Sequence, residues 1–454
     1  MFKVDELLEA TGGKLIQGRG DIIARGISID SRTIKPQEAF IAIKGVNLDG
    51  HGFIAEAIKK RAACIIASCQ QGALQKQKNV TFIEAQDTIK ALGDIAGYQR
   101  RKFNIPVIAI SGSNGKTTTK EMIAWILSKK FNVLKNEGTK NNHIGLPLAL
   151  LNLRPEHDIA VLELGTNHFG EIDYLGAICQ PNIGIITNIG PVHLEYFHNL
   201  EGVFREKYRL IENLKKPYIA ILNADSGPLR KQTARKIKKP IIFGFAIKHK
   251  CDFSATDIKI FNTKIEFLAG LKYRFTLKTL GYYNIYNALA AVAVARIFGI
   301  EYKDIKSRLV TFNFPQGRLK VIKLNKVRFI DDTYNSNPVS LGQALNTLNN
   351  FRTKGKKILV MGDMLELGNY KKLFHCQAGR RAAGVCDALI TVGKLSKMAA
   401  QTAQSCGLDV KNIFICDSVQ EAANILFNKI VPEEDDIVLV KGSRLMRMEE
   451  VFRG

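Results

Sequence analysis

The 454-residue chain contains no apolar run of the roughly 18 residues that a membrane-spanning helix needs. Its first residues include acids and lack a basic stretch followed by an apolar one, so we expect no secretory signal. The 37 glycines and 12 prolines are a far smaller share than the roughly 25–30% typical of disordered or collagen-like chains. These absences exclude disordered and fibrous classes and predict a globular protein without stable membrane insertion.

Clustered cysteines are also missing. The eight cysteines form no CxxC pair and have no spacing typical of a zinc site. We therefore expect buried, reduced thiols in a cytoplasmic protein rather than disulfides. The cysteines are Cys64, Cys69, Cys179, Cys251, Cys376, Cys386, Cys406 and Cys416.

Acidic residues are scarce relative to basic ones, since 66 Lys and Arg against 42 Asp and Glu give a formal net charge of +24. A field of that sign attracts anions, so nucleic acid, an acidic membrane surface and small polyanionic substrates are the candidate partner classes. The densest basic run, residues 230–239, contains no aromatic side chain on which a base could stack. We interpret it as a solvated helix face, and we expect no nucleic-acid partner.

The length predicts about three domains, since a domain averages roughly 150 residues. A basic, irregular stretch at 98–104 is interpreted as a linker, and a second irregular stretch at 312–317 as another boundary. The predicted domains are therefore 1–100, 101–313 and 314–454.

Apolar runs alternate with helical stretches throughout the chain, which predicts an α/β fold. The second domain is expected to contain a mostly parallel sheet covered on both faces, and the third a doubly wound, Rossmann-type sheet. Strands are expected at 39–43, 64–67, 80–83, 106–110, 159–164, 183–187, 218–222, 357–361, 388–392, 412–415 and 437–440.

The strongest chemical signal is residues 112–118, Gly-Ser-Asn-Gly-Lys-Thr-Thr, which follow an apolar strand and open a helix. Glycines allow the backbone to fold around phosphate oxygens, and amides at the helix start point at the anion. Lys116 would reach the β- and γ-phosphates, and the Thr117 hydroxyl would hold Mg²⁺. The full P-loop pattern requires glycine where this chain has Ile110, so the loop is a shortened variant. Such loops serve motors, switches, kinases and ligases, so the reaction stays open at this point.

Several other positions have two interpretations from the residues alone. Glu163 ends an apolar strand, where open α/β sheets place ligands, and is either a metal ligand or a solvated acid. His193 is either a ligand or polar loop surface, and Lys207 is one lysine among many on a basic helix. Asn284 and Asn287, three residues apart, share a helix face and either reach a nucleotide base or satisfy a cap.

Motifs in the second predicted domain resemble those of the Mur ligases, the ATP-dependent amide-forming enzymes of peptidoglycan precursor synthesis. The phosphate loop resembles the family's GxxGKT[TS], and Asn141–Pro147 resembles its NNxxGxP. Glu163 and His193 stand in segments similar to the family's metal segments, and Lys207 in one similar to its carbamylated-lysine segment. Residues 281–290 resemble its GxxNxxNAxA.

The resemblance extends over nearly the whole chain and favours the family members that add D-alanyl-D-alanine. Asp331–Pro338 resembles their DDxYNANP, Met361–Gly368 their MGDMxELG, and Lys441–Arg444 their KGSR. Asp30–Arg32 and Asp49–His51 resemble the uridine-nucleotide domain of the last two ligases of the pathway. The DNPR motif of the preceding, diaminopimelate-adding ligase is absent from the chain.

The resemblance implies three domains: a small N-terminal α/β uridine-nucleotide domain, a central P-loop ATPase-like domain and a C-terminal Rossmann-like domain that binds the incoming dipeptide. It implies a ligase that joins D-alanyl-D-alanine to UDP-N-acetylmuramoyl-tripeptide through an acyl phosphate. ATP, two Mg²⁺ ions and carbamylated Lys207 are the implied cofactors, and we expect a monomer. The alternatives are the preceding tripeptide-forming ligase, a folylpolyglutamate-synthase-like ligase and, from a different class, a basic P-loop ATPase that binds nucleic acid.

The resemblance also implies roles for individual residues. The implied catalytic residues are Lys116, Glu163, His193 and Lys207, and the implied metal ligands are Thr117, Glu163, His193 and the Lys207 carbamate. The implied ATP-binding residues are Gly112, Ser113, Asn114, Gly115, Lys116, Thr117, Thr118, Asn284, Asn287, Arg318 and Asp332. The implied substrate-binding residues are Ser31, Arg32, Asp49, Asn142, Thr166, Asn335, Asn337 and Asp363. Because Arg318 and Asp332 belong to the third domain, we expect domain closure to assemble the ATP site.

Overall fold

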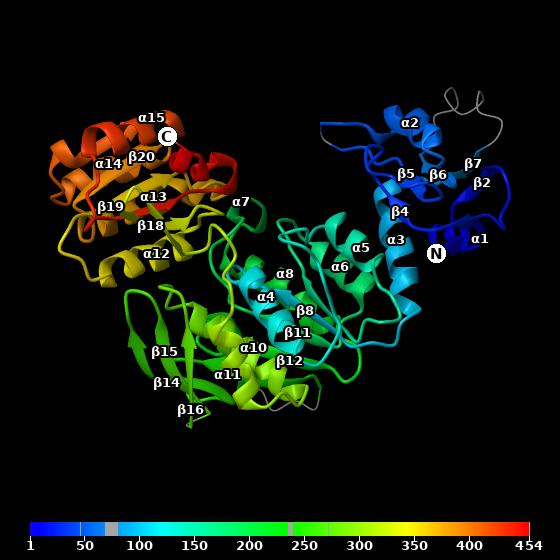
Figure 1. Cartoon of the computed structure of the whole chain (residues 1–454), viewed down its shortest axis with the longest axis horizontal. Helices are drawn as coiled ribbons and strands as arrows, with labels where there is room; N and C mark the ends of the chain where they lie inside the picture. The colour runs from blue at the N-terminus through cyan, green and yellow to red at the C-terminus, as the bar shows by residue number, and fades with distance from the viewer. Residues whose placement is uncertain (46, 69–79, 235–238, 271, 454) are drawn as a thin grey trace.

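The computed structural model describes residues 1–45, 47–68, 80–234, 239–270 and 272–453. Three large sheets follow one another along the chain, each with helices packed against it (Figure 1). Residues Phe2–Lys3 and Ile23–Ala24 form an additional two-stranded antiparallel sheet. We call the three parts the N-terminal, central and C-terminal units. The central unit lies between the other two, which confirms the expected α/β class with three parts in chain order (Figure 1).

The N-terminal unit contains a five-stranded sheet in the order β2-β7-β6-β5-β4, in which only β2 runs antiparallel to its neighbour. Its strands are β1 (Phe2–Lys3), β2 (Lys14–Gln17), β3 (Ile23–Ala24), β4 (Ile27–Ser28), β5 (Ala39–Ile41), β6 (Cys64–Ala67) and β7 (Thr81–Glu84). Its helices are α1 (Val4–Thr11), η1 (Gly50–Phe53), α2 (Ile54–Lys59) and α3 (Thr88–Arg101).

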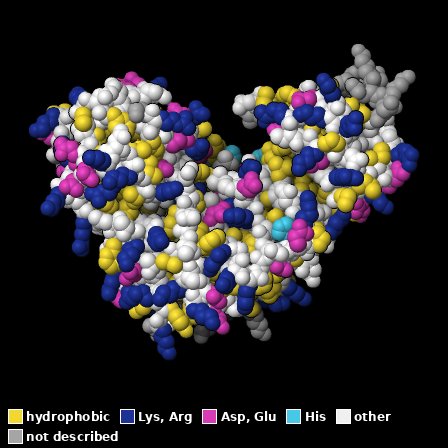
Figure 2. Space-filling model, in the orientation of Figure 1, with side chains coloured by type: hydrophobic (Ala, Val, Ile, Leu, Met, Phe, Trp, Pro, Cys, Tyr) yellow, Lys and Arg dark blue, Asp and Glu magenta, His cyan; other side chains and the backbone are white. Residues whose placement is uncertain are grey.

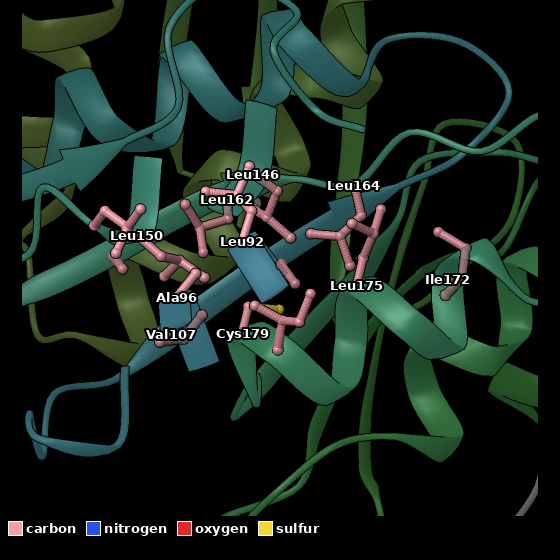
Figure 3. Packing of buried hydrophobic residues seen from close by; sticks show 14 of the residues in the cluster. Leu92, Ala96, Val107, Leu146, Leu150, Leu162, Leu164, Ile172, Leu175 and Cys179 are labelled. Carbon is pink, nitrogen blue, oxygen red and sulfur yellow. The ribbon is translucent and has the colours of Figure 1, made fainter. Parts of the chain in front are cut away.

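Helix α3 shows that the predicted linker was wrong over its first half. Residues 98–101 form the last turn of α3, and the buried guanidinium of Arg100 donates hydrogen bonds to the carbonyls of Cys179, Phe103 and Ile105. Figure 3 shows Leu92 and Ala96 of α3 beside apolar side chains of the central unit. The helix therefore joins the first two units through one hydrophobic core, and of the basic residues at its end Arg100 is buried whereas Arg101 is exposed.

The central unit contains a nine-stranded sheet in the order β16-β15-β14-β13-β12-β11-β8-β10-β9. Its strands are β8 (Val107–Ser111), β9 (Val133–Lys135), β10 (Ile159–Glu163), β11 (Ile183–Ile186), β12 (Ile219–Asn223), β13 (Ile241–Ala246), β14 (Phe253–Ile260), β15 (Ile265–Ala269) and β16 (Tyr273–Leu277). Its helices are α4 (Lys116–Leu127), α5 (Gly145–Leu150), α6 (Glu171–Cys179), α7 (Leu194–Phe197), α8 (Leu200–Glu212), α9 (Gly227–Thr233), α10 (Asn284–Ile297) and α11 (Tyr302–Val310). The pairings among strands β8 to β14 are parallel, whereas β14 with β15 and β15 with β16 pair in the antiparallel direction.

The C-terminal unit contains a six-stranded sheet in the order β17-β18-β22-β19-β20-β21, parallel except for β17. Its strands are β17 (Lys320–Leu324), β18 (Val327–Asp332), β19 (Lys357–Gly362), β20 (Ala388–Val392), β21 (Ile413–Cys416) and β22 (Ile437–Lys441). Its helices are α12 (Pro338–Asn350), η2 (Gly368–Tyr370), α13 (Lys371–Ala383), α14 (Ser396–Ser405), η3 (Val410–Asn412), α15 (Val419–Asn424), η4 (Ile425–Ile430), η5 (Arg444–Met446) and η6 (Met448–Arg453).

Both larger sheets are covered on their two faces, as predicted. In β8, Val107 packs into one hydrophobic cluster and Ile108 into another, because successive strand residues point to opposite faces. In β18, Phe329 and Ile330 likewise pack into two different hydrophobic clusters, one on each face of the sheet. The apolar runs therefore became buried parallel strands. The sequence did not predict β1 to β4, β9 and β13 to β18. Among these, β14, β16 and β17 mix polar residues with apolar ones, which hides them from a search for apolar runs.

The described cysteines are all unpaired. Cys64, Cys179, Cys386 and Cys416 are buried, whereas Cys406 is exposed, against the expectation of burial. Cys69 and residues 235–238 of the basic run lie outside the described residues, although Arg230 and Lys231 at the end of α9 are exposed. Among the described residues, no helix combines the length and apolarity needed to cross a membrane.

Candidate active site

A cavity of about 910 Å³ lies where the central and C-terminal units meet. Segments that follow β8, β10, β11 and β12 line its central side, and segments around β18 and the start of α12 line the other. Figure 2 shows the surface hollowed above the central unit, between the other two units. Of the residues singled out from the sequence, the cavity is lined by Ser113, Asn114, Gly115, Lys116, Thr117, Thr118, Asn142, Glu163, Thr166, His193, Asn284, Asn287, Arg318, Asp332, Asn335 and Asn337.

The phosphate loop needs both of its glycines. Gly112 and Gly115 have φ angles of +142° and +82°, which residues other than glycine rarely adopt. A Cβ atom at Gly112 would collide with the Thr187 hydroxyl, and one at Gly115 with the Asn287 amide. The backbone can turn from β8 into α4 in this space only because both positions lack a side chain.

The loop that follows β11 braces the phosphate loop. The Ser113 hydroxyl donates to the Gly190 carbonyl at 3.0 Å and accepts from the Gly190 amide at 2.9 Å. The Asn114 amide donates to the side-chain oxygen of Asn188 at 3.0 Å, and the Thr187 hydroxyl donates to the Asn114 carbonyl. These contacts hold the loop in place before any phosphate binds.

The Lys116 side chain folds back onto the phosphate loop. Its Nζ donates to the Gly112 carbonyl at 2.8 Å. Burial lowers the pKa of Lys116, the nearby Glu163 carboxylate opposes this shift, and Arg318 adds to it. Because its acceptor is a neutral carbonyl, the ammonium can exchange that contact for a phosphate oxygen.

Glu163, at the end of β10, is 1% exposed, and only one of its two carboxylate oxygens has a hydrogen-bond partner among the described residues. Its Oε1 accepts a hydrogen bond from Asn141 Nδ2 at 2.7 Å, whereas its buried Oε2 has no partner among the described residues. The Asn136 side chain fixes the Glu163 backbone through two hydrogen bonds, of 2.9 and 3.0 Å. A buried, unpartnered carboxylate oxygen beside a cavity fits a hard cation such as Mg²⁺, which prefers oxygen ligands.

The protein side chains do not complete a metal site alone. Among the described residues, no group of three or more His, Cys, Asp and Glu side chains is arranged to hold a metal ion. A cation at Glu163 therefore needs further oxygen donors, which the Thr117 hydroxyl, a bound phosphate or a modified lysine would supply.

His193 precedes α7 with a φ of +50°. Its Nδ1 donates to Oε2 of Glu366 at 2.5 Å, and the Phe197 ring lies edge-on to it with centroids 6.2 Å apart. Burial lowers the pKa of His193, Lys207 adds to the shift, and Glu366 opposes it. The hydrogen bond from His193 lowers the pKa of Glu366.

Lys207, on α8, is 1% exposed, and no described residue accepts a hydrogen bond from its ammonium or forms an ion pair with it. Burial sets the pKa of Lys207 well below its ordinary value, Lys116 adds to the shift, and Glu206 and Glu171 oppose it. The Glu206 carboxylate is engaged elsewhere, because it accepts from the amides of Gly170 and Ile172. Burial therefore makes the neutral form of Lys207 easier to reach than in an exposed lysine.

The C-terminal unit supplies two side chains that contact the phosphate loop directly. Arg318 donates to the Thr117 hydroxyl at 2.9 Å, and its guanidinium lies over the Tyr334 ring at 4.1 Å. Asn337, which caps α12, donates from Nδ2 to Asn114 Oδ1 at 2.7 Å. The loop is therefore shared between the two units.

Asp332 and Lys441 form a buried ion pair at the ends of β18 and β22, with Lys441 Nζ 2.5 Å from Asp332 Oδ2. Lys441 Nζ also donates to the Asn335 carbonyl at 2.8 Å. Burial raises the pKa of Asp332, although Lys441 and Arg318 oppose the shift. The second oxygen, Oδ1, accepts from the Leu319 amide at 3.2 Å.

Asn284 and Asn287 form one chain of hydrogen bonds in the first turn of α10. Asn287 Nδ2 donates to Asn284 Oδ1 at 2.9 Å, and Asn284 Nδ2 donates to the Thr279 hydroxyl at 3.0 Å. The Thr119 hydroxyl donates to Asn287 Oδ1 at 3.1 Å. Both interpretations of this pair are compatible with the structure, since the amides are satisfied and still line the cavity.

Six residues singled out from the sequence do not line the cavity: Gly112, Lys207, Asp363, Ser31, Arg32 and Asp49. Gly112 is the chain neighbour of Ser113, which lines the cavity, and Lys207 is buried on α8. Asp363 Oδ1 accepts from the Leu395 and Ser396 amides at the start of α14. The last three belong to the N-terminal unit, where Ser31 donates to Glu56 and Arg32 pairs with Asp30.

Four residues of the site were missed at the level of sequence. Asn136, Glu366 and Lys441 are the partners of Glu163, His193 and Asp332, and each is far from its partner in the chain. Asp225, which also lines the cavity, accepts from the Tyr286 hydroxyl at 2.8 Å and from two backbone amides. The only available signal was that Glu366 and Lys441 stand inside motifs already noted.

Family models match three consecutive parts of the chain. Residues 24–100 match "Mur ligase family, catalytic domain", residues 110–295 match "Mur ligase middle domain", and residues 317–444 match "Mur ligase, glutamate ligase domain".

Two relatives are named UDP-N-acetylmuramoyl-tripeptide--D-alanyl-D-alanine ligase. The Buchnera aphidicola subsp. Baizongia pistaciae protein is 38% identical, covering 95% of this chain and 92% of the relative. The Escherichia coli (strain K12) protein is 35% identical, covering 99% and 97%.

Solved structures of Mur ligases also resemble this chain over nearly its whole length. A crystal structure of MurF from Acinetobacter baumannii has a TM-score of 0.89 and 32% identity, covering 100% of this chain and 98% of the other. MurF ligase from Thermotoga maritima in complex with ADP has a TM-score of 0.82 and 29% identity, covering 96% and 98%. With these matches and the phosphate-loop cavity between two α/β units, the chain belongs to the Mur ligase family of ATP-dependent peptide ligases.

Proposed function

We propose that this chain joins D-alanyl-D-alanine to UDP-N-acetylmuramoyl-tripeptide at the expense of ATP, giving the pentapeptide, ADP and phosphate. One observation carries the proposal: the phosphate loop of the central unit meets Arg318 and Asn337 of the C-terminal unit beside the half-satisfied carboxylate of Glu163. The names of the relatives at 35% and 38% identity support the choice of substrates.

The reaction has two steps. A carboxylate oxygen at the tripeptide end attacks the γ-phosphorus, the bond to the bridging oxygen breaks, and ADP leaves. The amine of D-alanyl-D-alanine then attacks the acyl carbon, loses a proton, and phosphate leaves with the electrons of the broken carbon–oxygen bond. Both steps gather anions, so the cations of Lys116 and Arg318 would stabilise the charge that accumulates on the transferred phosphoryl group.

The proposed ATP-binding residues form two groups. The phosphate group consists of Gly112, Ser113, Asn114, Gly115, Lys116, Thr117, Thr118 and Arg318. The nucleoside group consists of Asn284, Asn287 and Asp332. The proposed division follows the family resemblance, because Asn287 also contacts the phosphate loop at Gly115.

We assign two Mg²⁺ ions to this site. Their proposed ligands are Thr117, Glu163, His193 and a carbamate on Lys207. When bound, Mg²⁺ neutralises phosphate charge and polarises the phosphoryl group. The unpartnered Oε2 of Glu163 supports this assignment. The lowered pKa of Lys207 favours its neutral amine, which is the form that bonds to CO₂ and then loses a proton. The carbamate would supply the oxygen donor that the site otherwise needs.

The remaining substrate contacts stay predictions. Asn142 and Thr166, which line the cavity, are proposed to contact the muramoyl-peptide. Asn335 and Asn337 are proposed to contact the dipeptide together with Asp363, whose carboxylate already caps α14. The uridine nucleotide is assigned to Ser31, Arg32 and Asp49 in the N-terminal unit. The boundaries 1–100, 101–313 and 314–454 are retained for the three domains.

We further propose that the chain acts as a monomer in the cytoplasm, where ATP and uridine nucleotides are available. The net charge of +24 attracts anions, and the proposed substrates are small polyanions, so part of this charge would serve substrate binding.

The proposal is tested by phosphate release from purified protein with ATP, Mg²⁺, D-alanyl-D-alanine and one UDP-muramoyl tripeptide. Separate reactions contain the diaminopimelate and the lysine form of the tripeptide, and controls omit the dipeptide or the tripeptide. We expect release that requires both peptides. Release stimulated by polynucleotide and independent of either peptide would instead support the nucleic-acid ATPase.

A further inference from the structure

We infer that Glu366, which belongs to the C-terminal unit, is the positioning residue for His193 of the central unit. Through this contact, the divalent-ion affinity of the site depends on the C-terminal unit. The inference rests on the proposed role of His193 as a metal ligand. It is carried by the 2.5 Å hydrogen bond from His193 Nδ1 to Glu366 Oε2.

The contact selects one nitrogen of the ring. A carboxylate oxygen only accepts, so Nδ1 carries the proton and Nε2 keeps its lone pair. Among the described residues, none hydrogen-bonds to Nε2, whereas His193 itself lines the cavity. Histidine ligands in metal sites commonly donate their other ring nitrogen to a carboxylate, which fixes the tautomer and the ring orientation.

Glu366 is itself held firmly. In its loop, the Leu365 amide donates to the Ser443 hydroxyl at 2.9 Å, and the Met364 amide donates to Nε2 of the buried His375 at 3.1 Å. Glu366 adopts a φ of +61°, which requires a fixed turn at that position. Two other segments of the C-terminal unit therefore determine where the Glu366 carboxylate lies.

The same loop docks on the backbone next to His193. The Glu195 amide donates to the Glu366 carbonyl at 3.3 Å. A Cβ atom at Gly368 would lie 3.1 Å from Glu195 Cα, so the two loops are in close backbone contact. Glu366 thus reaches His193 only when the C-terminal unit is docked on α7.

A purely structural role for Glu366 must be separated from a positioning role. The chain offers a second contact between the two units that does not involve His193. Asn262 Nδ2 donates to the Arg352 carbonyl at 2.6 Å, and the Arg352 amide donates to Asn262 Oδ1 at 3.0 Å. The Asn262→Ala variant therefore weakens docking at a distance from the cavity. The exposed Glu195 side chain provides a matched carboxylate on the same surface.

The experiment measures Mn²⁺ binding by electron paramagnetic resonance in protein that holds a non-hydrolysable ATP analogue. We expect Glu366→Ala to weaken one class of Mn²⁺ site about 10- to 100-fold, the usual effect of removing an outer-shell partner. Glu366→Gln keeps an acceptor for Nδ1 and should recover most of this affinity. Glu195→Ala and Asn262→Ala should bind Mn²⁺ as the unmodified protein does.

Two results would overturn the inference in different ways. If Glu366→Ala binds Mn²⁺ normally while His193→Gln loses a site, or if Asn262→Ala loses affinity equally, Glu366 acts only in docking. If His193→Gln also binds Mn²⁺ normally, the proposed metal role of His193 fails, and the inference fails with it.

Discussion

The guanidinium of Arg318 donates a hydrogen bond of 2.9 Å to the hydroxyl of Thr117, although the two residues belong to different units. Thr117 is the second residue of α4, and Arg318 stands just before β17. The cation that enters from the C-terminal unit therefore lies at the helix N-terminus that attracts phosphate. This contact links the placement of the two units to the nucleotide site.

Replacing Arg318 by alanine should weaken binding of a non-hydrolysable ATP analogue about 10- to 100-fold, because a hydrogen bond from a charged group contributes roughly 1.5–3 kcal/mol. Isothermal titration calorimetry measures the change. Arg352→Ala, at an exposed position of the same unit, is the matched control and should leave the affinity unchanged. Equal affinity of Arg318→Ala and the control would remove Arg318 from the site.

Removing Lys441 should destabilise the fold by about 3–5 kcal/mol, because Asp332 is left as an unpaired buried charge. Urea unfolding of Lys441→Met measures the loss, and Lys411→Met, which removes the exposed pair with Asp409, should change stability by only about 0.5 kcal/mol.

The loss should also depend on pH. Burial already raises the pKa of Asp332, and without Lys441 the carboxyl would take up a proton more readily in the folded state. A raised folded-state pKa stabilises at low pH and loses that effect as pH rises. The deficit of Lys441→Met should therefore be smaller at pH 5 than at pH 8. A deficit that grows on acidification would contradict the assigned environment of Asp332.

The Arg32–Asp30 pair allows a direct titration. Hydrogen bonds from the Arg32 side chain and amide lower the pKa of Asp30 to about 2. Its stabilising effect is present above the ordinary value of 3.8 and is lost as pH falls towards about 2. In NMR titrations of the carboxyl carbon, Arg32→Gln should raise the Asp30 pKa towards 3.8, and Arg19→Gln should not. An Asp30 that titrates near 3.8 in the unmodified protein would show that the pair is not formed.

Lys207→Ala should lower the ligase rate by at least about 100-fold, in the range found for loss of a group that stabilises developing charge. Short-chain carboxylic acids should restore part of the rate, because they return an anionic oxygen to the space beside Glu163. Lys215→Ala, at an exposed position beyond α8, is the control. Full activity of Lys207→Ala, with no response to added acids, would exclude the carbamate.

Local signals predicted the parts of the protein that depend on neighbouring residues. The apolar runs gave β8, β10 and β11, and the glycine spacing placed Gly112 and Gly115 at turns with positive φ. The position of Glu163 in the wall of the phosphate-loop cavity followed from the rule that strand carboxyl ends carry ligands. The contact of Asn337 with Asn114 did not, because Asn337 was expected only on the dipeptide side.

Pairings across long sequence separations could not be predicted in this way. Nothing in the sequence around His193 indicates that Glu366, 173 residues away, accepts its proton. The basic stretch at 98–104 resembled a linker, yet Arg100 is buried and donates hydrogen bonds to three backbone carbonyls. Packing supplied the partners in both cases, and composition did not reveal them.

The most direct measurement is a crystal structure with a non-hydrolysable ATP analogue and Mn²⁺, whose anomalous signal locates the ions. We predict that the β- and γ-phosphates occupy the loop at 112–118, with Arg318 on the phosphates and an ion bound to Glu163. An empty loop with the triphosphate elsewhere, or a Glu163 carboxylate turned away from both phosphate and ion, would contradict the account.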